Sequence, residues 1–218
     1  MNEAATGFGE EYWASNYATP QFMDGIANAR EHARYLKCYF EVEQVEIKTL
    51  VSMGFGLGVQ FREMLNVFSP DSAIGIDPSP FAHESIGNLQ LDPYDRIDIA
   101  LRQQSIQSWC SAPDGDETWD LGVCMSVFQY LPDEELRACI PVLASRLQFL
   151  YLTVPTDIEL RRQEEQCNFH DEWAIPRSRD WYQETIGSDF TFISSRVLES
   201  KHYFDETDTE LTDLLFRF

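Results

Sequence analysis

Near the start of the chain, apolar residues recur at intervals of three and four, and this spacing predicts a helix over about residues 20–42. The residues at these intervals are Phe22, Ile26, Ala29, Ala33, Leu36 and Phe40. An α-helix turns once in about 3.6 residues, so all six lie on one face, which must be buried. Residues 1–19 carry several aromatic side chains, and we expect this tail to dock on another surface and not to be free in solution.

After Glu46, short apolar runs rich in strand-forming residues alternate with helical stretches. The predicted strands are 47–53, 73–76, 97–102, 121–127 and 150–154, and the predicted helices are 58–67, 80–89 and 132–147. Residues 105–117 are expected to form a loop with at most one short helical turn. Alternation with short connections predicts a parallel sheet with helices on both faces.

The end of the chain has a different pattern. Residues 179–187 are predicted as a helix and are followed by two predicted strands, 190–198 and 210–218, with no helix between them. Such neighbours pair antiparallel. We therefore expect a doubly wound α/β fold: a mostly parallel, seven-stranded Rossmann-like sheet with an antiparallel last strand and an N-terminal helical extension. The expected organisation is a single domain over 1–218, with a helical cap (1–45) and a Rossmann-like core (46–218).

The sharpest chemical signal is a glycine-rich turn after the first predicted strand. Leu50-Val51-Ser52-Met53 runs into Gly54-Phe55-Gly56-Leu57-Gly58, where the absence of Cβ atoms lets a ligand lie against the backbone. A dinucleotide fingerprint would place its third glycine at position 59, which is Val59. No lysine follows the glycines, so a phosphate-binding P-loop is excluded. The turn favours a nucleoside ligand that lacks a pyrophosphate.

The second signal is a carboxylate at the end of the next predicted strand, in Ala73-Ile74-Gly75-Ile76-Asp77-Pro78. A carboxylate in this position can accept hydrogen bonds from both hydroxyls of a ribose. The alternative is that Asp77 only caps the helix that begins near Pro80.

These segments resemble the class I S-adenosylmethionine-dependent methyltransferases. Leu50–Gly58 resembles the first motif of that family, and Asp77 its ribose-binding acid. The segments 119–132 and 150–155 resemble its fourth and fifth strands with their following loops, and the terminal strand pair resembles its antiparallel seventh strand beside the sixth. The resemblance extends over about residues 45–218.

The resemblance implies a role for individual residues in binding S-adenosylmethionine. Gly54, Phe55, Gly56 and Gly58 would form the turn at the methionine part, and Asp77 would bind the ribose. The remaining cofactor positions are Pro78 beside the adenine, Ser105 and Ile106 near its amino group, and Met125 and Ser126 near the sulfonium.

The sequence departs from the family pattern at Ser52, where an acid is usual, and lacks an acid near the adenine. These departures leave open a non-catalytic partner protein with a methyltransferase fold. A second alternative is a nicotinamide-dependent oxidoreductase with a Rossmann-like fold, against which the position of the third glycine at Gly58 and the short chain argue. The favoured function is methyl transfer to an oxygen or nitrogen atom of a small molecule.

Candidates for the acceptor side follow the fourth and fifth predicted strands. His170 lies in a polar segment with Trp173 and could take a proton from a hydroxyl acceptor, and Tyr130 is its rival for a catalytic role. The N-terminal aromatics Tyr12 and Trp13 would add an apolar wall around the substrate. Packing against the first helix is the alternative for both.

Composition restricts the partners. The net charge of −21 argues against a nucleic-acid partner, because binding to phosphates depends on clustered cations. The nearest approach to a basic cluster is Arg161, Arg162, Arg177 and Arg179, which we interpret as ordinary solvated side chains.

The five cysteines show neither disulfide nor metal-site spacing, and no metal is expected. Without a leader or a membrane-length apolar run, the chain is expected to be cytoplasmic and not membrane-bound. The oligomeric state is open.

Overall fold

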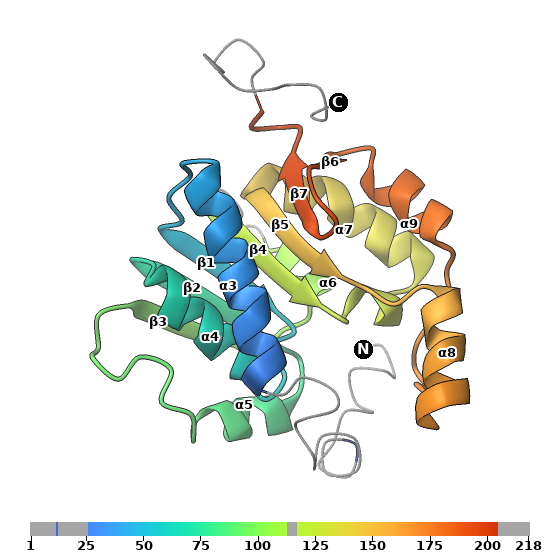
Figure 1. The fold of residues 1–218 in the computed structure, drawn as a ribbon, viewed down its shortest axis with the longest axis horizontal. Helices are drawn as coiled ribbons and strands as arrows, with labels where there is room; N and C mark the ends of the chain where they lie inside the picture. The colour runs from blue at the N-terminus through green and yellow to red at the C-terminus, as the bar shows by residue number, and fades with distance from the viewer. Residues whose placement is uncertain (1–11, 13–25, 113–116, 205–218) are drawn as a thin grey trace. The chain divides into compact units, whose positions relative to one another are not determined.

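Figure 1 shows the computed structural model, which describes Tyr12, residues 26–112 and residues 117–204. The strands form a seven-stranded sheet in the order β3-β2-β1-β4-β5-β7-β6. The pairs β1–β2, β2–β3 and β4–β5 are parallel, whereas β7 is antiparallel to both β5 and β6. This arrangement confirms the predicted Rossmann-like fold. The chain divides into two compact units, Met1–Ile106 and Gln107–Phe218.

The first unit alternates helices and parallel strands as the sequence predicts. Its elements are α3 (Ile26–Val42), β1 (Thr49–Met53), α4 (Val59–Phe68), β2 (Ser72–Ile76), α5 (Pro80–Ile86) and β3 (Asp98–Arg102). The predicted start of the first helix, before residue 26, lies outside the described residues.

The predicted apolar face of α3 is buried against α4. Ala29, Ala33, Leu36 and Phe40 are almost wholly inaccessible to solvent. The Phe40 ring meets that of Phe68 edge-on, with 6.1 Å between the ring centroids. Burial of a side chain the size of Leu36 or Phe40 stabilises the fold by about 1.5–3 kcal/mol. The three- and four-residue spacing in the sequence therefore marks a helix that covers the first βαβ segment.

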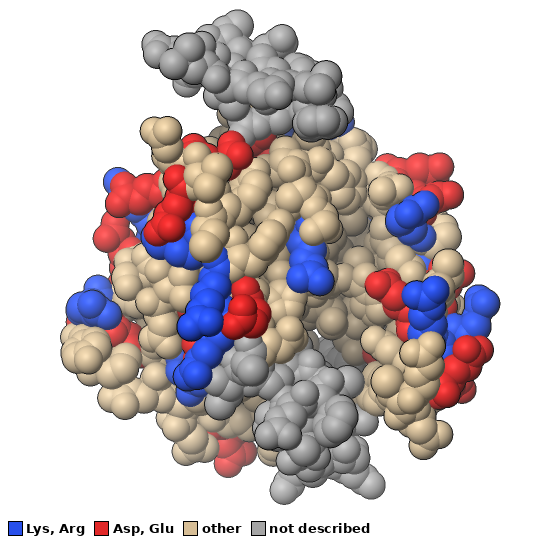
Figure 2. Space-filling model, in the orientation of Figure 1, with Lys and Arg blue, Asp and Glu red and all other residues tan. Residues whose placement is uncertain are grey.

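Basic side chains on the exposed face of α3 are matched by acids. Arg30 pairs with the buried Glu63 of α4 at 3.3 Å, and Arg34 pairs with Glu31 at 3.0 Å. In Figure 2, blue atoms run along this helix with red atoms beside them. Pairs of this kind leave little net positive charge along α3.

The second unit contains the remaining elements. These are α6 (Ile106–Cys110, beginning at the last residue of the first unit), β4 (Trp119–Met125), the 3₁₀ turn η1 (Phe128–Tyr130), α7 (Asp133–Arg146), β5 (Leu147–Thr153), α8 (Asp157–Cys167), α9 (Arg179–Ile186), β6 (Phe190–Phe192) and β7 (Val197–Ser200). Within residues 26–112 and 117–204, every helix is too short or too polar to traverse a bilayer.

One strand prediction is wrong. The range 190–198, predicted as one strand, contains β6, a tight turn and the start of β7, so both strands of the antiparallel pair end by residue 200. The turn forms because the Ser194 hydroxyl accepts hydrogen bonds from the backbone N–H groups of Arg196 and Val197. Short polar side chains that bond to nearby backbone promote such turns. The predicted strand 210–218 lies outside the described residues.

The sequence pattern does not predict the helix α8, which lies in the polar segment before His170. None of its side chains is buried, so it has no apolar stripe to detect. A capping box at its N-terminus, and not an apolar face, stabilises the start of α8. The Thr156 hydroxyl accepts from the Glu159 backbone, and the Glu159 carboxylate accepts from the Thr156 N–H at 2.8 Å.

A buried arginine fixes α6 to α7. Arg146, at the end of α7, donates to the backbone carbonyls of Trp109 (2.7 Å) and Ala112 (3.2 Å). Its guanidinium also stacks on the Trp109 ring, 4.9 Å from the centroid. The charge is thus satisfied by carbonyl oxygens and an aromatic face in place of an acid.

Candidate functional site

The glycine-rich turn after β1 has the backbone conformation that its glycines allow. Gly54, Gly56 and Gly58 have φ angles of +70°, +54° and +77°, in the left-handed region that side chains with a Cβ disfavour. At Gly58 there is also no space for a side chain, because an added Cβ would lie 2.6 Å from Ile86 Cγ1. Gly54 and Gly56 are partly accessible, so their backbone is open to a ligand.

The carboxylate of Asp77 lies directly against this turn. One of its oxygens accepts the backbone N–H of Gly56 at 2.9 Å, and the other accepts the backbone N–H of Ser79, also at 2.9 Å. The N-cap of α5 is Ser79, whose hydroxyl accepts from the Ala82 N–H. Asp77 therefore does not cap α5, and that alternative is excluded.

Burial and hydrogen bonding act in opposite directions on Asp77. The residue is 6% exposed, and this burial raises the pKa of its carboxyl above the ordinary value. The N–H groups of Ser79 and Gly56, and then the nearby His83, offset part of that rise in pKa. His83 Nε2 is 3.1 Å from the Asp77 carbonyl oxygen, and its ring packs edge-on against Phe55 at 5.0 Å. The Phe55 side chain thus belongs to the core around the turn.

The other predicted cofactor positions in the first unit differ in accessibility. Pro78 and Ser105 are partly exposed, whereas Ile106 is buried at the start of α6. Ser52 is buried within β1, in register with Gly75 of β2. The structure thus places a small, uncharged side chain where the family pattern has an acid.

In the second unit, the predicted positions Met125 and Ser126 follow each other at the end of β4. Ser126 is exposed and has a φ of +53°, a left-handed conformation that is uncommon for a residue with a side chain. Its N–H donates to the Thr153 carbonyl of β5 at 2.8 Å, which holds the chain in this turn. Strained backbone of this kind concentrates at functional sites.

Tyr130 and the segment that starts at His170 are brought together. The Tyr130 hydroxyl donates to the Asp171 carboxylate at 2.8 Å. Burial raises the pKa of Asp171, while Tyr130, the Trp173 backbone N–H and His170 act to lower it. The His170 side chain is 71% exposed, with Nδ1 at 3.5 Å from Glu164. Tyr130, Asp171, His170 and the partly exposed Trp173 therefore form one polar cluster.

Arg177, interpreted from the sequence as a solvated side chain, is instead 4% exposed. Its guanidinium donates to the carbonyls of Phe128 (3.1 Å) and Leu131 and to the Asp133 carboxylate (2.8 Å). It also stacks on the Trp181 ring at 4.5 Å. Arg177 thereby fixes the connection between α8 and α9 on the turn that carries Tyr130. Nothing in its sequence neighbourhood signals this burial.

The N-terminal candidates are only partly described. Tyr12 is half-buried, and Trp13 lies outside the described residues. Their predicted contribution to substrate binding stays a prediction.

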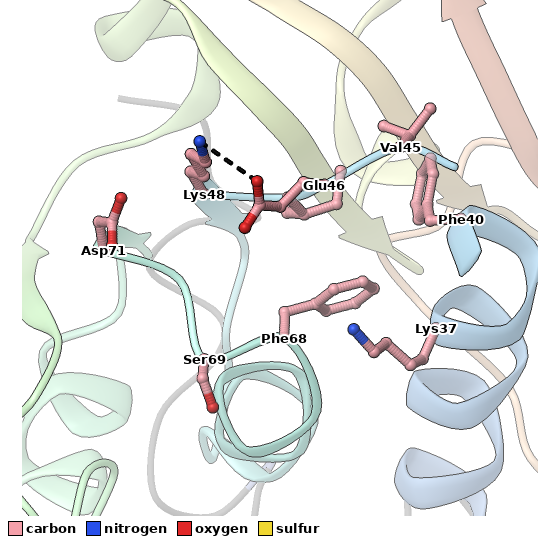
Figure 3. A pocket seen from close by; sticks show the side chains of 9 residues that line it. Lys37, Phe40, Val45, Glu46, Lys48, Phe68, Ser69 and Asp71 are labelled. Atoms are coloured by element: carbon pink, nitrogen blue, oxygen red, sulfur yellow. Dashed lines mark ion pairs between the residues drawn. The ribbon is translucent and has the colours of Figure 1, made fainter. Parts of the chain in front are cut away.

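A small cavity of about 140 Å³ opens at the opposite end of β1 from the glycine turn. Figure 3 shows Lys37, Phe40, Phe68 and Lys48 around it. Its two lysines already lie near acids, Lys37 at 3.6 Å from Glu41 and Lys48 at 3.2 Å from Glu46. We assign this cavity no part in the chemistry of the glycine turn.

The cysteines include one close pair that their sequence spacing does not reveal. Cys110 of α6 and Cys139 of α7 are hydrogen-bonded to each other, which raises the pKa of Cys110 and lowers that of Cys139. Within the described part of the chain, no group of three or more His, Cys, Asp or Glu side chains could hold a metal ion.

No protein-family model and no curated protein sequence matches the chain. Solved structures do match. The plantazolicin methyltransferase BamL, in complex with a desmethylplantazolicin analogue and S-adenosylhomocysteine, aligns with a TM-score of 0.64 and 13% identity, over 86% of this chain and 70% of that one. A methyltransferase from Clostridium acetobutylicum aligns with a TM-score of 0.64 and 9% identity, over 90% of this chain and 99% of that one.

A third match is the magnesium protoporphyrin IX methyltransferase of Synechocystis, with S-adenosylhomocysteine bound. It aligns with a TM-score of 0.57 and 16% identity, over 89% of this chain and 98% of that one. The chain has the class I methyltransferase fold. In this methyltransferase fold, the glycine turn after β1 and the acid after β2 stand where the sequence motifs predict them.

Proposed function

We propose that the protein is an S-adenosylmethionine-dependent methyltransferase that acts on an oxygen or nitrogen atom of a small molecule. The observation that carries the proposal is the Asp77 carboxylate, held against the glycine turn by two backbone N–H groups. The methyltransferase fold of the solved neighbours supports the same reaction class.

The residues at the turn fit an adenosine ligand. A carboxylate oxygen accepts two hydrogen bonds, and each Asp77 oxygen receives one from the backbone, so each retains a position for one ribose hydroxyl. The accessible backbone of Gly54 and Gly56 would receive the amino-acid part of the cofactor. Further binding positions in the proposal are Phe55, Gly58, Pro78, Ser105, Ile106, Met125 and Ser126.

S-adenosylmethionine, when bound, supplies a methyl group activated by a sulfonium. The protein then has to orient the acceptor atom, since alignment of reacting groups is worth about 7–11 kcal/mol. We assign this orientation to Tyr130, which Asp171 holds by a 2.8 Å hydrogen bond, with Trp173 and Tyr12 beside the acceptor. The exposed His170 imidazole would take the proton of a hydroxyl acceptor.

The cofactor part is tested by calorimetric titration with S-adenosylhomocysteine, S-adenosylmethionine and NAD. Asp77→Asn should weaken binding of S-adenosylhomocysteine at least tenfold, because hydrogen bonds to a charged acceptor contribute about 1.5–3 kcal/mol each. Asp71→Asn, at the start of β2 and exposed, is the matched control and should bind normally. Binding of NAD alone would favour an oxidoreductase. Binding of S-adenosylhomocysteine without transfer to any acceptor would favour a non-catalytic partner.

The acceptor part is tested by transfer of a radiolabelled methyl group from S-adenosylmethionine to a panel of phenols, catechols and primary amines. With any accepted compound, Tyr130→Phe should raise KM and leave cofactor affinity unchanged. His170→Ala should lower kcat for hydroxyl acceptors and have less effect on amines. Unchanged kinetics in both variants would contradict the assignment.

A further inference from the structure

A hydrogen-bonded pair of thiols joins α6 to α7 in the second unit. Cys110, the last residue of α6, and Cys139, in the middle of α7, share a hydrogen bond between their side chains. Cys139 is buried, at 3% exposure, whereas Cys110 is partly exposed to solvent. A solvent-accessible cysteine in contact with a second cysteine is the arrangement from which reversible disulfides form.

The contact between the thiols is one of a series along the two helices. Gln107 Nε2 of α6 donates to the Glu135 carboxylate of α7 at 2.6 Å. Gln107 lies one helical turn before Cys110, and Glu135 likewise lies one turn before Cys139. The side chains of α6 and α7 therefore meet at two successive turns, and the thiols form the second of these contacts.

Arg146, at the end of α7, fixes the backbone on both sides of Cys110. Its guanidinium donates to the carbonyl of Trp109, the preceding residue, at 2.7 Å. It also donates to the carbonyl of Ala112, two residues after Cys110, at 3.2 Å. Movement of Cys110 away from α7 would break these bonds to a buried cation, so the helix packing holds the two sulfur atoms together.

The shared hydrogen bond also determines which thiol holds its proton. It lowers the pKa of Cys139 by stabilising the thiolate, although burial and the nearby Glu135 carboxylate act in the opposite direction. The same bond raises the pKa of Cys110, which retains its proton and donates it to Cys139. Because the thiolate is the nucleophilic form of cysteine, transfer of this proton to Cys139 activates the Cys110 sulfur, the one that solvent reaches.

We propose that Cys110 and Cys139 are an oxidative modification site, at which hydrogen peroxide converts the two thiols into an intrachain disulfide. In the first step the Cys110 sulfur attacks one peroxide oxygen and passes its proton to the Cys139 thiolate. The O–O bond breaks, the second oxygen leaves as hydroxide, and Cys110 becomes a sulfenic acid.

In the second step the hydroxide takes the proton from Cys139 and forms water. The Cys139 sulfur attacks the Cys110 sulfur, the S–O bond breaks, and a second hydroxide leaves. The peroxide thus accepts two electrons, and one thiol and one thiolate are converted to a disulfide with release of one water and one hydroxide. The modification is independent of the proposed methyltransferase activity.

The test is disulfide mapping of the reduced full chain after treatment with hydrogen peroxide. Remaining thiols are blocked with N-ethylmaleimide before digestion, which prevents disulfide exchange. Trypsin yields the peptides 103–137 and 138–146, which the disulfide between Cys110 and Cys139 should join. Fragmentation of the joined peptides should assign the bond to Cys110 and not to the buried Cys124 on the same peptide. Dithiothreitol should separate the two peptides again.

Variants separate the roles of the two cysteines. Cys139→Ser removes the second thiol, so Cys110 should remain a sulfenic acid that dimedone labels. Cys110→Ser should leave the buried Cys139 largely unlabelled. The matched control replaces two exposed cysteines on other helices, Cys38→Ser and Cys167→Ser, and should form the same disulfide as the wild type. Circular dichroism of each variant verifies the fold.

A peroxide-treated wild-type chain without the Cys110–Cys139 disulfide overturns the proposal. A bond that uses Cys124, or one that joins two chains on a non-reducing gel, also overturns it. Stronger dimedone labelling of Cys139 in Cys110→Ser than of Cys110 in Cys139→Ser contradicts the order of the two steps.

Discussion

Replacement of Arg177 by alanine should destabilise the protein far more than replacement of its neighbour Arg179. The Arg177 guanidinium is buried and donates to the carbonyls of Phe128 and Leu131 and to the Asp133 carboxylate. The Arg179 side chain is 78% exposed, and its nearest acid, Asp180, is 3.8 Å away. Comparison of the two variants therefore separates the effect of a buried, hydrogen-bonded guanidinium from that of a surface charge on the same segment.

The expected magnitude follows from the contacts. Loss of the hydrogen bond to Leu131 leaves its buried carbonyl without that donor, which costs about 1–3 kcal/mol in the free energy of unfolding. Loss of the hydrogen bond to the Phe128 carbonyl costs about 1 kcal/mol more. The pair with the half-exposed Asp133 contributes about 0.2–1 kcal/mol. Stacking on Trp181 at 4.5 Å contributes about 0.5–2 kcal/mol. Together these predict a loss of roughly 3–7 kcal/mol in the free energy of unfolding.

Urea denaturation followed by far-UV circular dichroism measures this loss. Arg177→Lys keeps the charge but not the planar fork, so it should recover less than half of the difference. Arg179→Ala should stay within about 0.5 kcal/mol of the wild type. Equal destabilisation by Arg177→Ala and Arg179→Ala would refute the idea that the buried guanidinium fixes the α8–α9 connection.

Two further predictions concern the glycine turn. Gly58→Ala should lower stability by roughly 2–5 kcal/mol in thermal unfolding, because an alanine at φ +77° is strained and its Cβ would meet Ile86. Gly87→Ala is the control and should cost much less, because its φ of −59° is unstrained and its added Cβ would lie no closer than 3.3 Å to another atom, the Glu84 carbonyl oxygen. Burial raises the pKa of Asp77 above 3.8, so affinity for S-adenosylhomocysteine should fall as pH decreases through that raised pKa, and Asp77→Asn should remove this dependence. The stability that Asp77 contributes without ligand has the opposite trend: it is present at low pH and is lost as pH rises through the raised pKa.

Most of the sheet could be predicted because its strands are buried apolar runs bounded by glycine, proline and polar turns. β1, β2, β4 and β5 lie within a few residues of their predicted ranges, and β1 and β2 are followed by the predicted glycines and acid. The position of Asp77 was predicted, but its two backbone donors were not, since they depend on the path of the turn in space.

The features that could not be predicted depend on contacts distant in sequence or lack a periodic pattern. The Tyr130–Asp171 bond joins residues 41 positions apart, and the burial of Arg177 depends on carbonyls more than 40 positions away. The helix α8 has no apolar face, although Thr156 and Glu159 have the spacing of a capping box. That spacing is the sequence signal for this helix.

The absence of buried side chains in α8 has a consequence for motion. Its backbone hydrogen bonds are not protected by a packed layer, so opening of this helix exposes little apolar surface to water. Amide hydrogens along Asp157–Cys167 should therefore exchange with solvent deuterium long before those of α7, which buries Leu136, Ile140 and Leu143. The segment that leads into the Tyr130 cluster is thus predicted to open locally while the sheet stays folded.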